Sequence, residues 1–358
     1  MLDYLIVGSG LYGATFANIA SSFGKKCLVI DQRSQIGGNC YTENRQNIDI
    51  HKYGAHIFHT NNEKVWKYVN QFAKFIQYIN SPIVNINNKI YNLPFNMNLF
   101  HQVFNEIDPK KIQKIIDKEK FIGIPTNLEE QAMKLVGKTI YEMFIKEYTE
   151  KQWGKACKEL PPETIKRLPL RFTYDNNYFD DEYQGIPVNG YTNMIKKMLE
   201  NIEVRLNTKY DKSMLAKKII YTGMIDEFFN YKYGELEYRT LEFVELEYRT
   251  DNHQGNAVIN YPNSNIPYTR SIEHKHFNKE NKSDRTIVSY EFSKDYTIGD
   301  IPFYPINDKK NNRIYEKYKK LGRKCRNIYF VGRLGEYKYY DMDDTIENAM
   351  NLISKIDE

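Results

Sequence analysis

The sequence of 358 residues predicts an α/β fold, in which a parallel-sheet domain built from discontinuous segments is joined by a helical insertion domain and an antiparallel β-sheet domain. Three observations predict this fold. A strand, a glycine-rich turn, a helix and a second strand follow one another at the amino end, and a strand–glycine–helix segment returns near the carboxyl end. Between them, helical spacing gives way to alternating strand patterns.

The amino-terminal segment has the pattern of a dinucleotide-binding turn. The apolar strand 4–7 leads directly into a G-x-G-x-x-G turn that contains Gly8, Gly10 and Gly13, and helical spacing follows over 14–23. The first glycine permits a tight turn, the second lets the backbone approach a pyrophosphate, and the third allows close packing of helix against strand. The start of the helix offers N–H groups and a partial positive charge to phosphates. A Rossmann-like domain is therefore expected here.

The next segment favours FAD as the dinucleotide. The second strand, 26–30, ends at Asp31, where an acid binds ribose hydroxyls and disfavours the 2′-phosphate of NADP. A second glycine pair, Gly37 and Gly38, follows directly before Asn39 and lets the backbone pass close to the cofactor. This extended pattern is typical of FAD-binding proteins.

The carboxyl-terminal segment indicates a return to the same domain. Residues 327–331 form a strand pattern that runs into Gly332 and Arg333, and residues 345–356 have helical spacing. We expect Arg333 to meet the pyrophosphate or ribityl chain of the cofactor; the alternative is a surface salt bridge.

The middle of the chain contains further elements. We expect a helix over 63–75, a hairpin of strands 83–86 and 89–93 around Asn87-Asn88, and mainly helices over 97–157. Strand patterns dominate from 165 to 305, including a sequence repeat at 235–240 and 245–250 that indicates similar strand patterning. The expected domains are an FAD-binding domain (1–80, 205–228 and 322–358), a helical domain (97–162) and an antiparallel-sheet substrate domain (81–96, 163–204 and 229–321).

Composition narrows the class of protein. With 51 basic and 46 acidic residues, the formal charge of +5 does not indicate a nucleic-acid partner. The four cysteines form no C-x-x-C pair, and nothing in their spacing resembles a zinc site, so a reducing setting is expected. We expect no signal peptide and no stable membrane insertion, since Asp3 interrupts the first apolar run and no stretch approaches about 20 apolar residues. A cytoplasmic location is expected.

Several polar and aromatic segments carry a family resemblance. They are 51–60, 92–97, 148–154, 166–179, 267–270, 272–277 and 336–342. Together with the dinucleotide segments they resemble the prokaryotic UDP-galactopyranose mutases, members of an FAD superfamily that includes amine oxidases and GDP-dissociation inhibitors. The resemblance covers essentially the whole chain.

The resemblance implies an isomerase. Such enzymes interconvert UDP-galactopyranose and UDP-galactofuranose without net redox change, yet they require reduced FAD, whose N5 atom is the nucleophile. The galactofuranose supplies cell-surface polysaccharide, and a homodimer is the habit of the family. Activity on UDP-N-acetylgalactosamine stays open.

The resemblance also implies site residues. Arg167 and Arg270 match positions that bind the diphosphate and His59 one near the reactive edge of the flavin. The substrate-binding positions are Phe144, Tyr148, Thr149, Trp153, Tyr178, Asn260, Tyr304, Tyr339 and Asp341. The cofactor-binding positions are Gly8, Gly10, Gly13, Asp31, Gly38, Asn39, His56, Arg333 and Met342.

Alternatives accompany these assignments. The two arginines are also typical of surface salt bridges. His56 and His59 lie three residues apart, but without a helical register or a nearby acid cluster, so no metal is predicted. The rival functions are a flavin oxidase or desaturase of the same superfamily, and a non-enzymatic binder like the GDP-dissociation inhibitors. The oxidase would not need paired arginines, and the binder would not need all the cofactor glycines.

Overall fold

The computed structural model describes residues 1–165, 168–278 and 280–356, which form two compact units. Unit 1 comprises residues 1–78, 181–238 and 302–358, and unit 2 comprises residues 79–180 and 239–301. The helical segment 97–162 shares unit 2 with an extended sheet, whereas residues 181–204 and 302–321 belong to unit 1. The division into three domains stays a prediction.

Unit 1 is built on a parallel sheet. Its strands, in sheet order, are β10 (Glu203–Arg205), β2 (Cys27–Ile30), β1 (Tyr4–Val7), β11 (Lys218–Tyr221) and β17 (Ile328–Phe330). Every neighbouring pair is parallel, and Val7 lies opposite both Ile30 and Tyr221. The carboxyl ends of the three central strands therefore meet at one edge, where open α/β sheets bind ligands.

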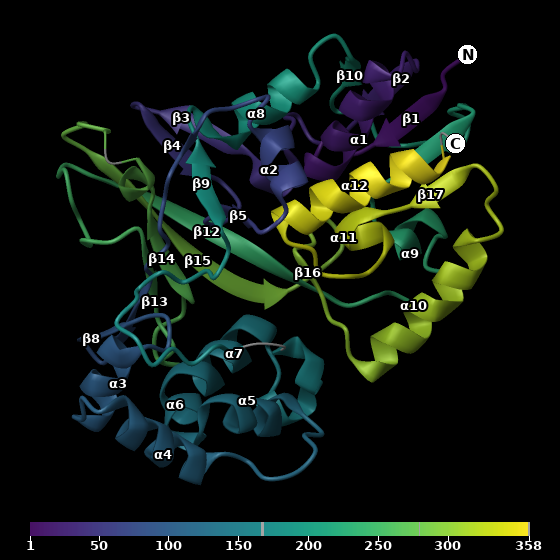
Figure 1. Cartoon of the computed structure of the whole chain (residues 1–358). Helices are drawn as coiled ribbons and strands as arrows, with labels where there is room; N and C mark the ends of the chain where they lie inside the picture. The colour runs from purple at the N-terminus through teal and green to yellow at the C-terminus, as the bar shows by residue number, and fades with distance from the viewer. Residues whose placement is uncertain (166–167, 279, 357–358) are drawn as a thin grey trace. The chain divides into compact units, whose positions relative to one another are not determined.

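Helices α1 (Leu11–Ser22) and α12 (Met342–Ile356) pack side by side in unit 1, although they come from opposite ends of the chain (Figure 1). Tyr4 and Ile6 of β1 belong to the core cluster that contains both helices, whereas Leu5 packs with the cluster of the other face. This alternation is the period of two expected for a strand covered on both faces. The other helices of unit 1 are η1 (Gly38–Cys40), α2 (Glu63–Val69), α8 (Gly190–Met198), α9 (Ile225–Phe228), α10 (Lys309–Gly322) and α11 (Gly332–Gly335).

Short strands complete unit 1. β3 (Thr42–Arg45) pairs with β4 (Ile48–His51), and β9 (Tyr183–Pro187) lies between β5 (Phe58–Thr60) and β6 (Phe75–Ile76); β16 is Tyr304–Pro305. The helix expected over 63–75 was too long, because it ends at Val69 and the chain becomes a strand at Phe75. The strand pattern expected from 165 to 305 was likewise interrupted, since α8 lies within it.

Unit 2 contains a six-stranded arrangement. In sheet order the strands are β12 (Tyr238–Tyr248), β15 (Thr286–Asp295), β14 (Arg270–Glu273), β13 (Val258–Asn260), β7 (Ile83–Ile86) and β8 (Lys89–Asn92). The pair β13–β7 is parallel, so the sheet is mixed and not wholly antiparallel. Asn87 and Asn88 have φ angles of 50° and 64°, which confirms the predicted hairpin turn. The sequence repeat lies partly in a single strand, since residues 238–240 and 245–248 form the two ends of β12.

Helices form the rest of unit 2. They are α3 (Met97–Phe104), α4 (Pro109–Glu119), α5 (Leu128–Val136), α6 (Lys138–Ile140), η2 (Tyr141–Ile145), α7 (Lys146–Trp153), η3 (Cys157–Glu159), η4 (Pro162–Thr164) and η5 (His274–Phe277). The side chains of Asn96, Asp108 and Asn127 cap the first turns of α3, α4 and α5, which explains where these helices begin. Across the described residues, no helix is long and apolar enough to cross a membrane.

Candidate functional site

The glycine turn of unit 1 has no room for side chains. A Cβ atom on Gly13 would lie 1.9 Å from the carbonyl oxygen of Gly8, and one on Gly38 would lie 3.0 Å from the Cα atom of Gly10. Gly8 has a φ angle of 109°, and Gly10 forms a β-bridge with Gly37. Two glycine loops thus lie against each other where α1 begins, leaving backbone N–H groups open to an anionic ligand. This arrangement fits a dinucleotide pyrophosphate.

Asp31 holds the end of β2 next to this turn. Its carboxylate accepts hydrogen bonds from the Ser9 backbone N–H at 2.8 Å, the Ser9 hydroxyl at 2.7 Å and the Arg33 backbone N–H at 2.9 Å. A carboxylate offers about four lone-pair sites, so one is left for a ribose hydroxyl. The position and chemistry of Asp31 fit the predicted ribose contact.

Arg33 belongs to the same region and was not predicted from the sequence. Its Nη2 donates to Oδ1 of Asn39 at 2.9 Å, and its guanidinium lies 5.1 Å from the centroid of the Tyr53 ring. Its Nη1 is buried without a hydrogen-bond partner among the described residues. A buried donor without a partner is costly, so Nη1 is suited to an acceptor group of a bound ligand. The signal in the sequence was a cation two residues after the ribose acid.

Arg333, Tyr304 and Tyr339 come together in unit 1. The guanidinium carbon lies 4.6 Å from the ring centroid of Tyr339 and 5.8 Å from that of Tyr304. Arg333 donates to the carbonyl oxygens of Phe303 at 3.1 Å and Tyr340 at 2.7 Å. These contacts fix the cation against two rings, and no ion pair of Arg333 occurs within the described part of the chain, which disfavours the salt-bridge alternative.

Asp341 and Met342 mark the start of α12. The carbonyl oxygen of Asp341 accepts hydrogen bonds from the backbone N–H and the hydroxyl of Thr345, at 3.0 and 2.8 Å. Met342 is the first residue of the helix and packs against the core of unit 1. Both residues therefore lie on a fixed backbone, two and three positions after Tyr339.

The histidines of segment 51–60 have separate partners. His59 Nδ1 lies 2.9 Å from Oδ2 of Asp181, whereas His56 Nδ1 lies 2.6 Å from the carbonyl oxygen of Gly54. Both partner oxygens accept hydrogen bonds, so the Nδ1 atom of each histidine carries a proton. Within the residues that the structure describes, no group of three or more metal-binding side chains is found.

In unit 2, Arg270 lies in a row of paired residues across three strands. Asn260 of β13 is the register partner of Arg270 on β14, which in turn is opposite Glu291 on β15. The Arg270 Nη2 donates to Glu291 Oε2 at 2.6 Å, and its Nε lies 3.1 Å from both carboxylate oxygens. Glu291 is wholly buried, whereas 24% of the Arg270 side chain is exposed. The sheet thus brings two predicted residues together and fixes the cation by a buried carboxylate.

Tyr178 lies in the chain between η4 and β9. Although 43% of Tyr178 is exposed, desolvation at the hydroxyl end raises its pKa, and the positive charges of Arg270 and Arg171 oppose this increase. Arg171 also donates to the carbonyl oxygen of Tyr178 at 3.2 Å. Arg171 lies within the segment 166–179 that carries the family resemblance, but the resemblance implies no role for it. Arg167 lies outside the described residues.

The remaining substrate-binding predictions lie on the continuous helical stretch α6–η2–α7. Phe144 is buried in the π-helical turn η2, where its ring packs edge-on to Tyr91 at 5.3 Å. Tyr148 and Thr149 follow on α7, with Thr149 buried. Trp153 ends α7 and packs against the apolar core, so its ring is partly covered by apolar neighbours.

Lys151 of α7 holds the chain between Asn260 and Arg270, and was not predicted to act. Its Nζ, which has three N–H groups to share, lies within hydrogen-bonding distance of four carbonyl oxygens, those of Tyr261, Asn263, Ile266 and Tyr268, at 2.6, 2.9, 2.8 and 3.1 Å. Desolvation lowers the pKa of Lys151 to about 8, and the charge of Glu147 opposes this decrease. At pH 7 the ammonium group is therefore mostly protonated and can donate.

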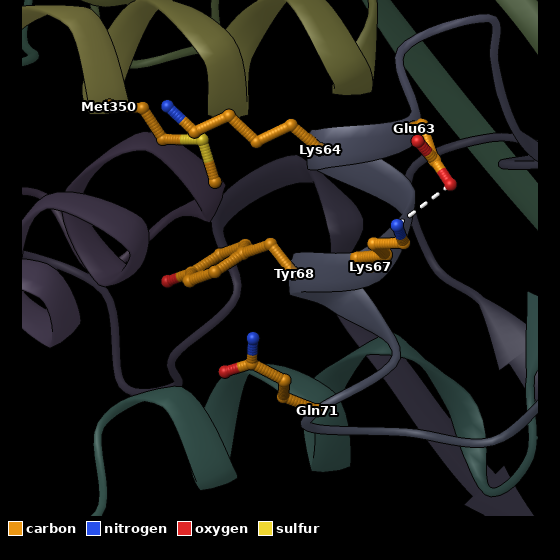
Figure 2. Close-up of a pocket in the computed structure, with 6 residues that line it drawn as sticks. All are labelled: Glu63, Lys64, Lys67, Tyr68, Gln71 and Met350. Atoms are coloured by element: carbon orange, nitrogen blue, oxygen red, sulfur yellow. Dashed lines mark ion pairs between the residues drawn. The ribbon is translucent and has the colours of Figure 1, made fainter.

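A separate pocket of about 380 Å³ lies on unit 1 (Figure 2). Residues of α2 and α12 line it together with Gln71, and the ion pair between Glu63 and Lys67, 2.7 Å long, lies at one side. The full lining is Glu63, Lys64, Lys67, Tyr68, Gln71 and Met350. None of these is a predicted site residue, and we assign the pocket no role.

Comparison with known proteins gives two family matches. A profile described as UDP-galactopyranose mutase matches residues 143–339, and one described as an NAD(P)-binding Rossmann-like domain matches residues 6–72. Their joint span includes the glycine turn and most predicted site residues.

Full-length relatives carry two different names. A Klebsiella pneumoniae protein named "Probable UDP-galactopyranose mutase" is 41% identical over 97% of this chain and 93% of its own length. A "dTDP-fucopyranose mutase" of Escherichia coli is 39% identical over 98% and 97%, and a "UDP-galactopyranose mutase" of Mycoplasma genitalium is 33% identical over 98% and 95%.

Solved structures share the fold at low sequence identity. A crystal structure of reduced UDP-galactopyranose mutase has a TM-score of 0.76 at 14% identity, covering 100% of this chain and 95% of that one. A putrescine oxidase variant has a TM-score of 0.62 at 10% identity, covering 99% and 98%. These likenesses show the fold alone.

Proposed function

The chain belongs to the UDP-galactopyranose mutase family, and we propose that it interconverts UDP-galactopyranose and UDP-galactofuranose, using FAD that is active when reduced. The observation that supports this most is the row of Asn260, Arg270 and Glu291, because a fixed, partly exposed guanidinium suits a nucleoside diphosphate. An oxidase that acts on an apolar substrate would not require such a guanidinium.

Unit 1 supplies the residues that would hold the cofactor. We propose that the backbone around Gly10 and Gly38 receives the pyrophosphate and that Asp31 binds the ribose. Arg33 and Asn39 would bind the same half of the cofactor, and Arg333, His56 and Met342 the flavin half. When bound and reduced, FAD would supply the N5 nucleophile that displaces UDP at the anomeric carbon.

Unit 2 supplies residues for the leaving group. As the bond between the anomeric carbon and UDP breaks, negative charge grows on the diphosphate, and Arg270 would stabilise it with donors already held in place by Glu291. Tyr178 would donate its hydroxyl, and Arg167 is proposed as the second cation. Asn260, Phe144, Tyr148, Thr149 and Trp153 would contact the nucleotide and sugar.

The remaining predicted residues lie in unit 1. Tyr304, Tyr339 and Asp341 are proposed to bind the sugar or diphosphate. His59, whose Nδ1 is engaged by Asp181, would present Nε2 for a hydrogen bond or proton transfer during ring opening. Supply of galactofuranose to cell-surface polysaccharide, a homodimeric state and a cytoplasmic location are further proposals that follow from family membership.

An anaerobic assay tests the proposal. The purified protein, with bound flavin measured by absorbance, is reduced with dithionite and incubated with UDP-galactofuranose, and the products are separated by chromatography beside an oxidised control. We expect conversion to UDP-galactopyranose only after reduction. A flavoprotein that converts no nucleotide sugar but consumes oxygen with an amine would instead support the oxidase alternative.

The sugar nucleotide itself needs a second test, because a relative named dTDP-fucopyranose mutase is 39% identical, between the 41% and 33% of two relatives named for UDP-galactopyranose. We propose UDP-galactose as the preferred substrate. Reduced enzyme is offered UDP-galactopyranose, UDP-N-acetylgalactosamine and dTDP-fucopyranose separately, and kcat/KM values are compared. A higher value for dTDP-fucopyranose would assign the chain to the other activity and leave the mutase chemistry standing.

A further inference from the structure

We propose that unit 2 attaches peripherally to anionic lipid bilayers through a surface formed by α4 and the loop after it. This surface, the α4 face, comprises Lys110, Lys114 and Lys118 together with Ile122 and Ile124. The inference is independent of the sugar nucleotide that the enzyme converts. It concerns adsorption to a membrane surface and not a membrane span.

The apolar part of the α4 face is exposed to an unusual degree. Ile122 and Ile124 are 95% and 88% exposed. Single exposed apolar residues are common, but two nearly bare isoleucines on one loop form a patch that water solvates poorly. Such residues are typical of segments that insert into the headgroup region of a bilayer.

The loop is held in this exposed conformation. Lys134 Nζ donates to the carbonyl oxygen of Gly123 at 2.9 Å. The backbone N–H and hydroxyl of Thr126 donate to Glu130 Oε2 at 2.7 and 2.8 Å. The isoleucines are therefore presented by a fixed backbone, which lowers the entropy lost when a partner covers them.

The charged part of the α4 face lies on one side of the helix. Lys110, Lys114 and Lys118 are spaced four residues apart and are exposed, whereas Ile112 and Ile116 are buried. The stripe therefore faces away from the core and ends four residues before Ile122. In Figure 1, α4 lies at the rim of the helical part of unit 2.

The acidic side chains near this stripe are engaged elsewhere. Asp117 pairs with Lys120 at 2.8 Å, and Glu119 accepts hydrogen bonds from the hydroxyl and backbone N–H of Thr139. Asp108 caps α4, and Glu106 accepts from two backbone N–H groups and pairs with Lys111 at 3.4 Å. For Lys110, Lys114 and Lys118, no ion pair occurs among the residues that the structure describes. Their charges are available to anions.

Charge complementarity decides between the partners for this surface. A second copy of the chain would bring one lysine stripe against another in a symmetric contact, and like charges repel. An anionic bilayer offers negative headgroups to the lysines and an apolar layer to the isoleucines. The same surface therefore suits phosphatidylglycerol-containing membranes better than self-association.

Vesicle flotation with the full-length flavoprotein tests the proposal. Binding to phosphatidylcholine vesicles is compared with binding to vesicles containing phosphatidylglycerol, at low and high salt. We expect binding only to the anionic vesicles, lost at high salt. The variant K110Q/K114Q/K118Q should lower the partition coefficient on the order of 100-fold, given the usual gain per lysine near an anionic surface. K309Q/K317Q/K320Q, which removes three exposed lysines of α10, should change it far less.

A tryptophan placed in the loop gives a local readout. Ile122→Trp should show a blue-shifted emission when anionic vesicles are added, and Leu215→Trp, at an 81% exposed residue of unit 1, should not. Ile122→Ser/Ile124→Ser should weaken flotation without changing mutase turnover. The proposal would be overturned if the protein did not bind anionic vesicles or if the two triple lysine variants had equal effects. It would also be overturned if the α4 substitutions changed the oligomeric state and not the flotation. A failure of the mutase assay alone would leave it intact.

Discussion

The Arg270 guanidinium is oriented by a carboxylate that has no contact with water. Glu291 is wholly buried, so its charge is stabilised by the Arg270 cation, and in turn it fixes the orientation of that cation. Removing one partner of such a pair typically costs about 3–5 kcal/mol of stability. A simple truncation would therefore mix a loss of stability with a loss of function.

Replacement by lysine separates the two effects. Arg270→Lys keeps the charge opposite Glu291 but loses the planar fork, so we expect the fold and the flavin content to persist while kcat/KM falls on the order of 100-fold or more. Turnover and flavin absorbance are measured on the same preparation. Near-normal turnover in the lysine variant would rule out a fork-specific role for Arg270.

The two carboxylate oxygens of Asp31, in the proposed cofactor site, allow a second substitution. Asp31→Asn keeps the shape of the side chain but turns one acceptor oxygen into a donor, which opposes the Ser9 N–H and hydroxyl. We expect FAD affinity to fall about tenfold, as for one lost charge-assisted hydrogen bond. The FAD dissociation constant is measured by titration of deflavinated protein, with Asp211→Asn, the same change at an exposed aspartate of unit 1, as the control. An unchanged constant for Asp31→Asn would contradict the ribose contact.

The glycine turn and Asp31 could be located from the sequence because their spacing is local. The pairing of Asn260 with Arg270 and Glu291 depends on sheet register over residues far apart in the chain. No local pattern identifies Glu291 as a buried partner. Lys151 was not predicted either, because its acceptors are backbone carbonyl oxygens, whose positions no side-chain pattern reveals.

Among the elements, the predictions succeeded where turn chemistry or periodicity was strong. The Asn87-Asn88 hairpin and strands β1, β2 and β17 lie close to their expected bounds. The expected helix over 63–75 was too long because apolar residues after Val69 continue the helical spacing but pack as strand β6 beside β9. Tertiary pairing there overrides local periodicity.

Lys151 connects α7 to the loop that joins β13 and β14. A methionine in its place would fill a similar volume but leave four carbonyl oxygens without their shared donor. We expect faster hydrogen exchange over residues 261–268 in Lys151→Met and a drop in turnover of about tenfold, with FAD unchanged. Lys146→Met, at an exposed lysine that begins α7, is the matched control. Exchange that rises equally throughout unit 2 would show general destabilisation and not a tether.

For the molecule as a whole, two compact units predict two unfolding transitions. The glycine turn, Asp31 and Arg333 all lie in unit 1, so FAD should stabilise that unit alone. At FAD concentrations about 100 times the dissociation constant, the gain is about 2.7 kcal/mol, or a rise of about 5–10 °C in one transition. Calorimetry with and without FAD measures it. A common shift of both transitions would show that the units unfold together.

Glu273 provides the means to identify the transition of unit 2. Its carboxylate is wholly buried, accepts the backbone N–H groups of His253 and Gln254 at 2.9 and 2.8 Å, and lies 3.1 Å from His276 Nε2. Burial by itself raises the pKa of Glu273, but the hydrogen bonds from His276 and the two N–H groups outweigh it and lower the pKa to about 2.

The sign of the resulting pH dependence follows from this shift. A carboxylate whose folded pKa lies below its unfolded value stabilises the folded state above the unfolded pKa of about 4.5, and the stabilisation is lost as the pH falls from about 4.5 to about 2. The shift corresponds to about 3 kcal/mol at neutral pH. Glu273→Gln should therefore lower the stability of unit 2 by up to this amount at pH 7 and much less near pH 2.5. Urea unfolding at both pH values measures the difference, and a difference that stays constant with pH would mean that packing at this position, and not the charge, stabilises the unit.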